Sequence, residues 1–151
     1  MQGLRARQST CSTREVWTNN NTYIMIIDQL SIFLNNAVGR VTEVTTILGK
    51  AGVNLKAFTL SESSDFGILR LMTEDNAKAA EVLRENHFAV NLTKVVFLEL
   101  GDTPGALSKC IQRGSDAGIS IEYMYAFSTG NAASVVVRTE DVESLNSLLE
   151  V

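Results

Sequence analysis

Hydrophobic and polar positions alternate along residues 26–34, which places Leu30, Ile32 and Leu34 on one face. A period of two is typical of a half-buried β-strand. After a polar turn, apolar residues recur at the three- and four-residue spacing of an amphipathic helix. These helical positions are Val41, Val44, Leu48 and Ala51. The pattern therefore predicts a strand, a turn and a helix in succession.

The same type of pattern continues to residue 93. Gly52 follows the helix and is predicted to end it, because glycine adopts the left-handed C′ conformation at little cost. Three more strands and a second helix are then predicted: strands over Val53–Ser61, around Leu69 and Leu71, and over Phe88–Thr93, with a helix presenting Ala79, Val82 and Leu83 before the last strand. The order is β-α-β-β-α-β.

The chain then repeats itself at an offset of 66 residues. Three separate blocks match in one register, and the alignment needs no gap between Asn35 and Leu83. The blocks are 39–44 with 105–110, 51–55 with 117–121, and 73–75 with 139–141. In the second copy the strands are predicted over Lys94–Leu100, over Ile119–Ser128 and around Val135 and Val137. One ungapped register across three blocks indicates an internal duplication.

The repeated order predicts an α+β fold of two tandem ferredoxin-like units. Each unit has an antiparallel sheet with its helices on one face. We expect the first unit at residues 25–93 and the second at residues 94–151. The second copy stops before any counterpart of Phe88–Thr93, so the last strand of its sheet is expected to be missing or borrowed.

Residues 1–24 differ in composition from the rest of the chain. The segment contains three arginines but a single acidic residue, Glu15; the arginines are Arg5, Arg7 and Arg14. The segment has no apolar core of the kind that a secretory signal needs. Its Arg and Ser/Thr content leaves an organelle-targeting segment possible, but we expect a disordered leader or an upstream start before Met25.

Composition excludes several classes of protein. The 151 residues are 45% hydrophobic and 20% charged, as in ordinary globular domains, and the net charge is −4. An acidic chain is a poor match for a phosphate backbone, so nucleic acid is not an expected partner. No apolar run approaches the ~18 residues of a membrane span. We expect a cytoplasmic protein with no membrane partner.

The usual catalytic and metal-binding patterns are also missing from the sequence. His87 is the single histidine, so one chain cannot form a multi-histidine metal site. Any Ser-His-Asp triad would have to use His87, and no such set of residues is visible in the sequence. Cys11 and Cys110 lie far apart, with no metal-ligand spacing. Glu74-Asp75 and Glu140-Asp141 stand where helices begin, which favours capping over catalysis. We expect no catalytic residues, no metal and no cofactor.

Two pairs of segments carry a resemblance to a known family. They are DTPGALSK with DAGISIEYMYAF and NNAVGRVTEV with KAGVNLKAF. Together they resemble the ACT domain, the regulatory module of amino-acid metabolism, twice over residues 25–151. The arrangement is similar to small stand-alone tandem ACT proteins. The resemblance implies a dimer that binds an amino acid where two ACT units meet, and that acts on a protein target not identified by the sequence.

The resemblance also implies which residues contact the ligand, namely the first strand-to-helix loop and the start of the second strand. The implied residues are Asn35, Asn36, Gly39 and Asn54 in the first copy, and Asp102, Gly105 and Ser120 in the second. Asp65 and Tyr125 are second-rank candidates. The chemistry suits a zwitterion, because a helix N-terminus favours a carboxylate and Asp102 could receive an ammonium. The alternative is that the Asn and Asp side chains only cap helices and form turns.

Three functions are consistent with these residues. The leading hypothesis is a non-catalytic regulatory protein that binds an amino acid. A second is a structural or interaction subunit with vestigial sites that acts through sheet edges or dimer contacts. A third is a small acylphosphatase-type enzyme, which would need an arginine in a phosphate-binding loop. Arg40 is the one loop candidate, and its counterpart is Ala106.

Overall fold

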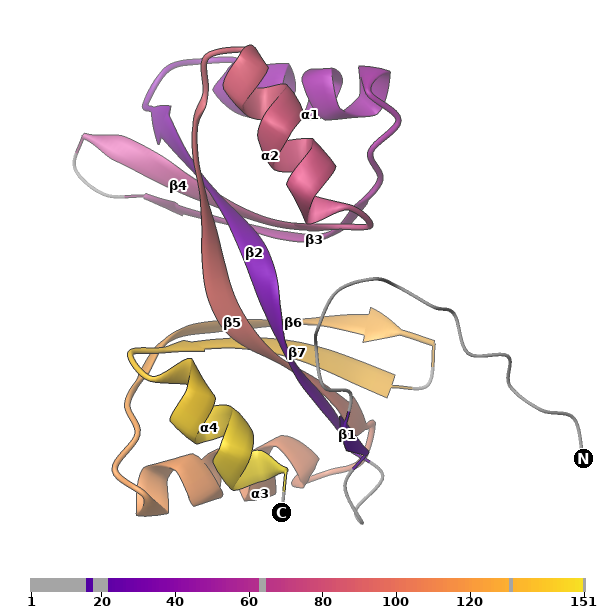
Figure 1. The fold of residues 1–151 in the computed structure, drawn as a ribbon, viewed down its shortest axis with the longest axis vertical. Helices are drawn as coiled ribbons and strands as arrows, with labels where there is room; N and C mark the ends of the chain where they lie inside the picture. Colours follow the sequence, from indigo (N-terminus) through magenta and orange to yellow (C-terminus); the bar gives the residue numbers. More distant parts are fainter. Residues whose placement is uncertain (1–15, 18–21, 63–64, 131, 151) are drawn as a thin grey trace, which may run out of the picture.

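Two long antiparallel strands, β2 (Tyr23–Asn35) and β5 (Ala89–Gly101), run side by side through both repeats (Figure 1). They belong to a computed structural model that describes residues 16–17, 22–62, 65–130 and 132–150. The remaining elements lie at the two ends of this strand pair, with α1 and α2 at one end and α3 and α4 at the other (Figure 1).

The element order confirms two βαββα repeats on one antiparallel sheet. In the first repeat the elements are α1 (Arg40–Lys50), β3 (Leu55–Glu62), β4 (Phe66–Thr73) and α2 (Asn76–Glu85). In the second they are α3 (Ala106–Asp116), β6 (Ile121–Thr129), β7 (Ala132–Thr139) and α4 (Val142–Leu149). The strands lie in the order β3-β4-β2-β5-β7-β6, and the short β1 (Val16–Trp17) pairs with the start of β2.

Strand β5 is continuous where the sequence pattern predicted two strands, Phe88–Thr93 and Lys94–Leu100. No glycine, proline or turn residue separates these segments, and β2 pairs with β5 without a break from Tyr23↔Glu99 to Phe33↔Ala89. The sheet also begins earlier than predicted, because Val16–Trp17 and Tyr23–Ile24 are paired strands. Residues 1–15 and 18–21 of the expected leader lie outside the described residues.

The last strand of the second unit is borrowed from the beginning of β2. Residues 23–28 pair with the second half of β5, in the position that the first half of β5 occupies in the first unit. Residues 30–35 pair with β4 on their other side, while residues 30–33 pair with the first half of β5, and this part of β2 belongs to the first unit. Both units thereby obtain four strands, which confirms the ferredoxin-like plan.

All four helices cover the same face of this sheet. Along β2, Leu30, Ile32 and Leu34 pack in the core beneath α1 and α2, while Ile24 and Ile26 pack in the core beneath α3 and α4. These residues all have even numbers, so the pleat places them on one side. The odd-numbered residues of β2 face the opposite, helix-free side.

The sheet curls so that its helix-free face closes on itself. Met72 and Ala57, from the first unit, share a hydrophobic cluster with Val136, Tyr125 and other residues of the second unit. In Figure 1 the two halves of the sheet accordingly lie between the two pairs of helices. A curled sheet thus buries both of its faces.

The predicted helix ends are confirmed. Gly52 and Gly118 have φ values of 71° and 74°, the left-handed conformation that ends α1 and α3. Asp75 and Asp141 cap α2 and α4 by accepting hydrogen bonds of 3.0 Å from the Lys78 and Ser144 amides. Within the described residues, no helix is long and apolar enough to cross a membrane.

Because the first residues of β2 complete the sheet of the second unit, a core substitution there should destabilise the second unit more than the first. Ile24 is 1% exposed and packs beneath α3 and α4. We expect Ile24→Ala to lower the free energy of unfolding by about 2–5 kcal/mol in urea titrations, through the lost apolar contacts and the cavity left behind. In hydrogen exchange, protection should fall more in α4 and β7 than in α1. Val38→Ala, at a fully exposed position, is the control and should change stability little.

Candidate functional site

The two strand-to-helix turns have the same backbone conformation. Gly39 and Gly105 have φ values of 87° and 84°, which a residue with a side chain rarely adopts. Each turn closes with an equivalent 2.8 Å hydrogen bond, from the Ala37 amide to the Asn35 carbonyl and from the Thr103 amide to the Gly101 carbonyl. The duplication has therefore preserved the turn itself, although the residues in it differ.

These turns lead into helices that have no side-chain cap. Gly39 and Gly105 stand at the N-cap positions of α1 and α3 and have no side chain to accept from the first helical amides. By contrast, aspartates cap α2 and α4. In the part of the chain that the structure describes, no side chain at the N-cap position accepts from the first amides of α1 or α3, where the helix dipole is positive.

The surroundings of the first turn are open and apolar. The Asn36 Oδ1 and Leu60 Cδ1 atoms lie 3.8 and 3.5 Å from the place a Gly67 Cβ would occupy, so both side chains border this glycine. Val38 is fully exposed, and Leu60 is 55% exposed. At the second turn the corresponding residues are Asp102, Ala126, Ala133 and Pro104. The two turns thus present different side chains on the same backbone.

Arg40 does not face a phosphate-binding loop. Its guanidinium is 2.7 Å from the Glu43 carboxylate and lies 4.6 Å above the centre of the Phe88 ring. These contacts hold the side chain against α1 and the core. They give no support to the acylphosphatase hypothesis.

Asn54 and Ser120 lie at the opposite ends of their units from the turns. Asn54 follows α1 and precedes β3, whose first residue pairs with Thr73. That end of the unit lies at the middle of the molecule, where Asn76 donates to the Asp28 carbonyl. An eleven-residue helix such as α1 spans about 16 Å, so one unit does not bring Asn54 to its own turn.

The two turns are also far from one another. They follow the opposite ends of the antiparallel pair β2 and β5, each 13 residues long. Strands of this length span about 40 Å. The sequence-predicted residues therefore form separate groups: Asn35, Asn36 and Gly39 at one end, Asp102 and Gly105 at the other, and Asn54 and Ser120 near the middle.

Charged side chains surround the two residues near the middle. The Lys56 ammonium lies 2.9 Å from the Glu74 carboxylate, and this contact, with a hydrogen bond from Asn54, lowers the pKa of Glu74. Ser120 lines a surface groove with Glu140, Asp141 and Ser144. The pKa of Asp141 is also lowered, chiefly by its hydrogen bonds with Ser144. Asp65 is exposed at the start of β4.

A buried polar network joins the two units and was not predicted. Gln29 is 0% exposed on the helix-free face. Its Nε2 donates to the Ser31 and Tyr123 hydroxyls at 3.1 Å, and its Oε1 accepts from the Tyr125 hydroxyl at 2.8 Å. The Arg70 guanidinium lies 3.8 Å above the Tyr123 ring. Tyr125, a second-rank ligand candidate, is thus placed in this junction and not beside either turn.

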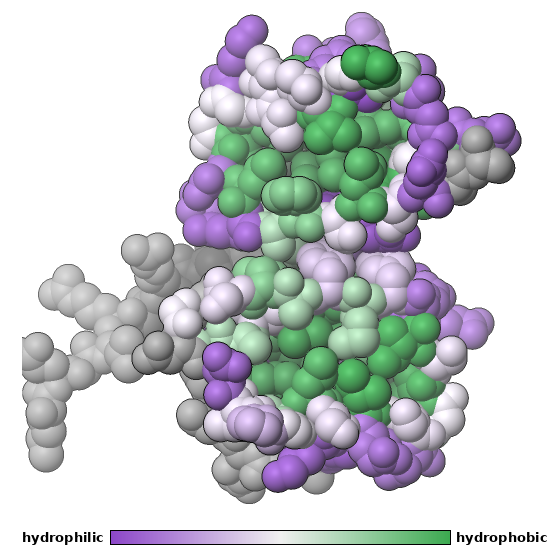
Figure 2. Space-filling view, turned by 180° about the vertical axis from the view of Figure 1, so that it is seen from behind, coloured by the Kyte–Doolittle hydropathy of each residue, from purple (hydrophilic) through white to green (hydrophobic). Residues whose placement is uncertain are grey.

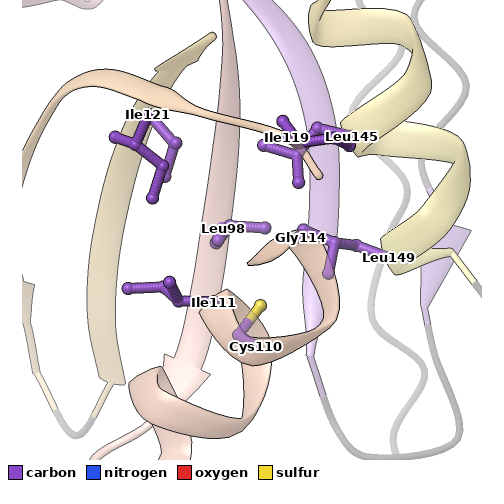
Figure 3. A pocket seen from close by; sticks show the side chains of 9 residues that line it. Leu98, Cys110, Ile111, Gly114, Ile119, Ile121, Leu145 and Leu149 are labelled. Carbon is purple, nitrogen blue, oxygen red and sulfur yellow. The ribbon is translucent and has the colours of Figure 1, made fainter. Parts of the chain in front are cut away.

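The second unit has a small apolar cavity beneath α3 and α4 (Figure 3). At this position Gly114 replaces the buried Leu48 of the first unit, and Leu145 replaces Ala79. The Leu145 Cδ1 lies 3.4 Å from where a Gly114 Cβ would be, so the larger residue on α4 fills space lost on α3. The lining offers no polar side chain that could orient a zwitterion. Among the described residues, no group of three or more His, Cys, Asp or Glu side chains could hold a metal ion.

Comparison with solved structures defines the class of fold. The regulatory subunit of aspartate kinase from Thermus thermophilus is 15% identical, with a TM-score of 0.54 over 83% of this chain and 93% of that one. The corresponding subunit from Thermus flavus is 17% identical, with a TM-score of 0.52 over 90% and 97%. The chain therefore has the fold of ACT regulatory domains.

A family match makes the assignment specific. Residues 25–149 match the ACT domain pair family, and the chain belongs to it. Protein BT0572 from Bacteroides thetaiotaomicron is 46% identical, with a TM-score of 0.78 over 84% of this chain and 88% of that one. No curated protein matches the chain.

Removal of the Gln29 amide tests the junction. Gln29→Leu breaks the hydrogen bonds between the Gln29 amide and the hydroxyls of Ser31, Tyr123 and Tyr125, and we expect the free energy of unfolding to fall by about 1–3 kcal/mol. The same substitution at the exposed Gln112 is the control, with an expected change within about 0.5 kcal/mol. In a double-mutant cycle that combines Gln29→Leu with Tyr125→Phe, the effects on the free energy of unfolding should differ from additivity by at least about 0.5 kcal/mol. Additive effects would contradict a shared network.

The Tyr125 hydroxyl also predicts a pH dependence. Burial, and then the neighbouring Tyr123, raise the pKa of Tyr125 above its ordinary value of 10.0. The folded state therefore keeps this proton when the unfolded chain has lost it, so stability is full below pH 10 and falls as the pH rises further. We expect the free energy of unfolding to fall less steeply above pH 10 for Tyr125→Phe than for the wild type. Parallel curves would exclude this contribution.

Proposed function

We propose that this protein is a non-catalytic, cytoplasmic regulatory protein that binds an amino acid or a similar small metabolite. The observation that carries this proposal is the pair of strand-to-helix turns, identical in backbone and opening onto helices without a side-chain cap. Family membership supports it, since ACT domains are regulatory modules.

The chemistry of the turns suits a zwitterion. Backbone amides at the start of α1 or α3, together with the helix dipole, favour a carboxylate. Asn35 and Asn36 offer both donors and acceptors, whereas Asp102 offers a negative charge for an ammonium. The two sites are accordingly expected to differ in affinity.

The site is completed between two copies of the chain. One unit keeps Asn54 at the far end of α1 from Gly39, and the two turns of one chain lie about 40 Å apart along β2 and β5. A ligand that contacts both a turn and the start of a second strand therefore needs a second unit beside the first. A homodimer supplies that unit, and ligand binding favours one arrangement of the two copies over others.

An interaction subunit with vestigial sites is the second candidate. One observation favours it: Phe58 and Leu60 are 68% and 55% exposed on β3, which pairs only with β4 among the described strands. Exposed apolar edges of this kind invite another protein.

A thermal-shift screen against the twenty amino acids and related metabolites tests the ligand proposal. A ligand at 100 times its Kd should stabilise the protein by about 2.7 kcal/mol, because it binds the folded state only. With the compound that gives a shift, Asn35→Ala and Asn54→Ala should each raise the Kd by about 2- to 10-fold through a lost hydrogen bond.

Asn91→Ala provides the matched control for these variants. Asn91 is exposed on β5, away from both turns, and its removal should leave the Kd unchanged. Asp102→Ala tests the second turn separately. A screen in which no compound raises the Tm would exclude amino-acid sensing and leave the interaction subunit as the better candidate.

A further inference from the structure

One arginine at the junction between the two units has no acidic partner among the described residues. Seen from behind, hydrophilic and weakly polar side chains border the apolar surface of each unit, also where the two units meet (Figure 2). At the junction the Arg70 guanidinium, from β4, lies over the Tyr123 ring of β6. Three other cationic side chains form ion pairs with carboxylates, whereas Arg70 forms none with the residues that the structure describes.

The guanidinium of Arg70 is held in place but is only partly satisfied. It lies 3.8 Å from the centre of the Tyr123 ring, and its Nη1 donates to the Ser61 hydroxyl at 3.0 Å. Its Nε is buried and has no hydrogen-bond partner in the described part of the chain. The residue as a whole is partly exposed, so a small solute can reach the guanidinium. A partly desolvated charge without a partner is unfavourable, and a bound anion would relieve this cost.

Hydroxyl groups, and no acidic side chains, surround this arginine on the sheet. Arg70 pairs with Thr59 on β3 and with Ser31 on β2, and directly paired residues point to the same face. The Ser31 hydroxyl lies 3.5 Å from that of Thr93 on β5. The described strand residues on the helix-free face of the first unit include no Asp or Glu. Hydroxyls can donate to an oxyanion, so the surroundings reinforce the positive charge instead of neutralising it.

The second unit shows that the fold does not need a charge at this position. At the offset of 66 residues Arg70 corresponds to Val136, which is 0% exposed in the helix-free cluster. Ser61 and Ser31 likewise correspond to aromatic residues, Phe127 and Phe97. The same face of the same sheet plan is thus filled by apolar side chains in one unit and by a cation with hydroxyls in the other. Packing therefore gives no reason for the cation.

We propose that Arg70 is the centre of an anion-binding site at the junction, which takes the carboxylate or phosphate group of a small molecule. A planar guanidinium suits either group, because it donates to two oxygens at once. The hydroxyls of Ser61 and Thr59 supply further donors beside it. This site is separate from the two turns and does not depend on the proposed function.

Occupancy of this site is connected to both units. Arg70 belongs to the first unit and contacts the second through Tyr123, whose hydroxyl accepts from Gln29 at 3.1 Å. An anion that binds Arg70 only when the sheet is curled favours that arrangement over others. The same linkage raises the stability of the folded chain when the anion is present.

A titration of the full chain with inorganic phosphate, followed by ¹H–¹⁵N NMR, tests where an anion binds. Phosphate replaces chloride at constant ionic strength, so that screening does not change. We expect saturable shifts of the backbone amides of Ser61, Arg70 and Tyr123. Shifts confined to residues 39–41 and 105–107 would place the anion at the helix N-termini and overturn the proposal, as would the absence of any saturable shift.

The same titration with acetate distinguishes the two oxyanions. If the amides near Arg70 saturate at a lower concentration of phosphate than of acetate, the site is a phosphate site. The reverse order assigns it to a carboxylate. Either order supports a site at Arg70, whereas no saturation with either probe contradicts it.

A charge-removing variant with a matched control tests the role of Arg70. Arg70→Gln should raise the Kd for phosphate by about 10-fold or more, because a charge-assisted hydrogen bond is lost. Arg84→Gln is the control, since Arg84 also forms no ion pair in the described chain and lies on α2, across the sheet from Arg70. Its Kd should stay close to that of the wild type. Equal weakening by both variants would indicate an effect of net charge and refute the site.

Two milder variants keep the test valid if Arg70→Gln disturbs the fold. Ser61 is exposed, so Ser61→Ala should stay folded, and the loss of one hydrogen bond to Arg70 should raise the Kd by about 2- to 10-fold. Arg70→Lys retains the charge but not the planar fork, and should also bind phosphate more weakly than the wild type. Wild-type affinity in both variants would show attraction to surface charge alone and refute the site.

The outcome is separable from that of the amino-acid screen. If phosphate or acetate binds at Arg70 but no amino acid raises the Tm, the junction site holds and the sensing function fails. If an amino acid raises the Tm while both anions leave the amides near Arg70 unchanged, the junction site fails and sensing is retained.

Discussion

The unbroken pairing of β2 with β5 is the constraint on which the rest of the structure depends. Each strand serves both units: the first half of β5 completes the sheet of the first unit, and the second unit has no complete sheet without residues 23–28 at the start of β2. A four-stranded unit of this size buries little surface alone. The shared strands join two marginal cores into one sheet, and they fix the positions of all four helices along it.

The shared strands also explain the polar junction. A sheet with all its helices on one face leaves the other face open, and here the sheet curls until that face meets itself. Gln29 lies where the strand passes from one unit to the other, and the hydroxyls of Tyr123 and Tyr125 satisfy its amide. Hydrogen bonds require their donors and acceptors to be aligned. The network therefore restricts the angle between the two units more than apolar contacts alone would.

Local patterns were sufficient to predict much of the fold. The repeat is visible in the sequence as one register at an offset of 66 residues. The period-two and helical patterns, like the caps at Asp75 and Asp141, depend on residues close in sequence. All of these predictions are confirmed. The closure of the sheet depends on contacts between residues far apart in sequence, and the Gln29 junction on residues 94 and 96 apart, for which one sequence gives no signal. The candidate site was similarly predictable only in part, because position in a repeat does not show that Gly39 and Asn54 lie at opposite ends of a unit.

The duplicated units have diverged in complementary ways. In the core, loss of the Leu48 side chain at Gly114 is partly offset by Leu145 in place of Ala79, and a small apolar cavity remains there. At the turn, Asp102 replaces Asn36, and at the edge Ala126 replaces Leu60. The core exchange thus keeps most of the packing, whereas the exposed positions are under no such constraint. The turns and edges are therefore the parts of the surface at which the two units differ in side-chain chemistry.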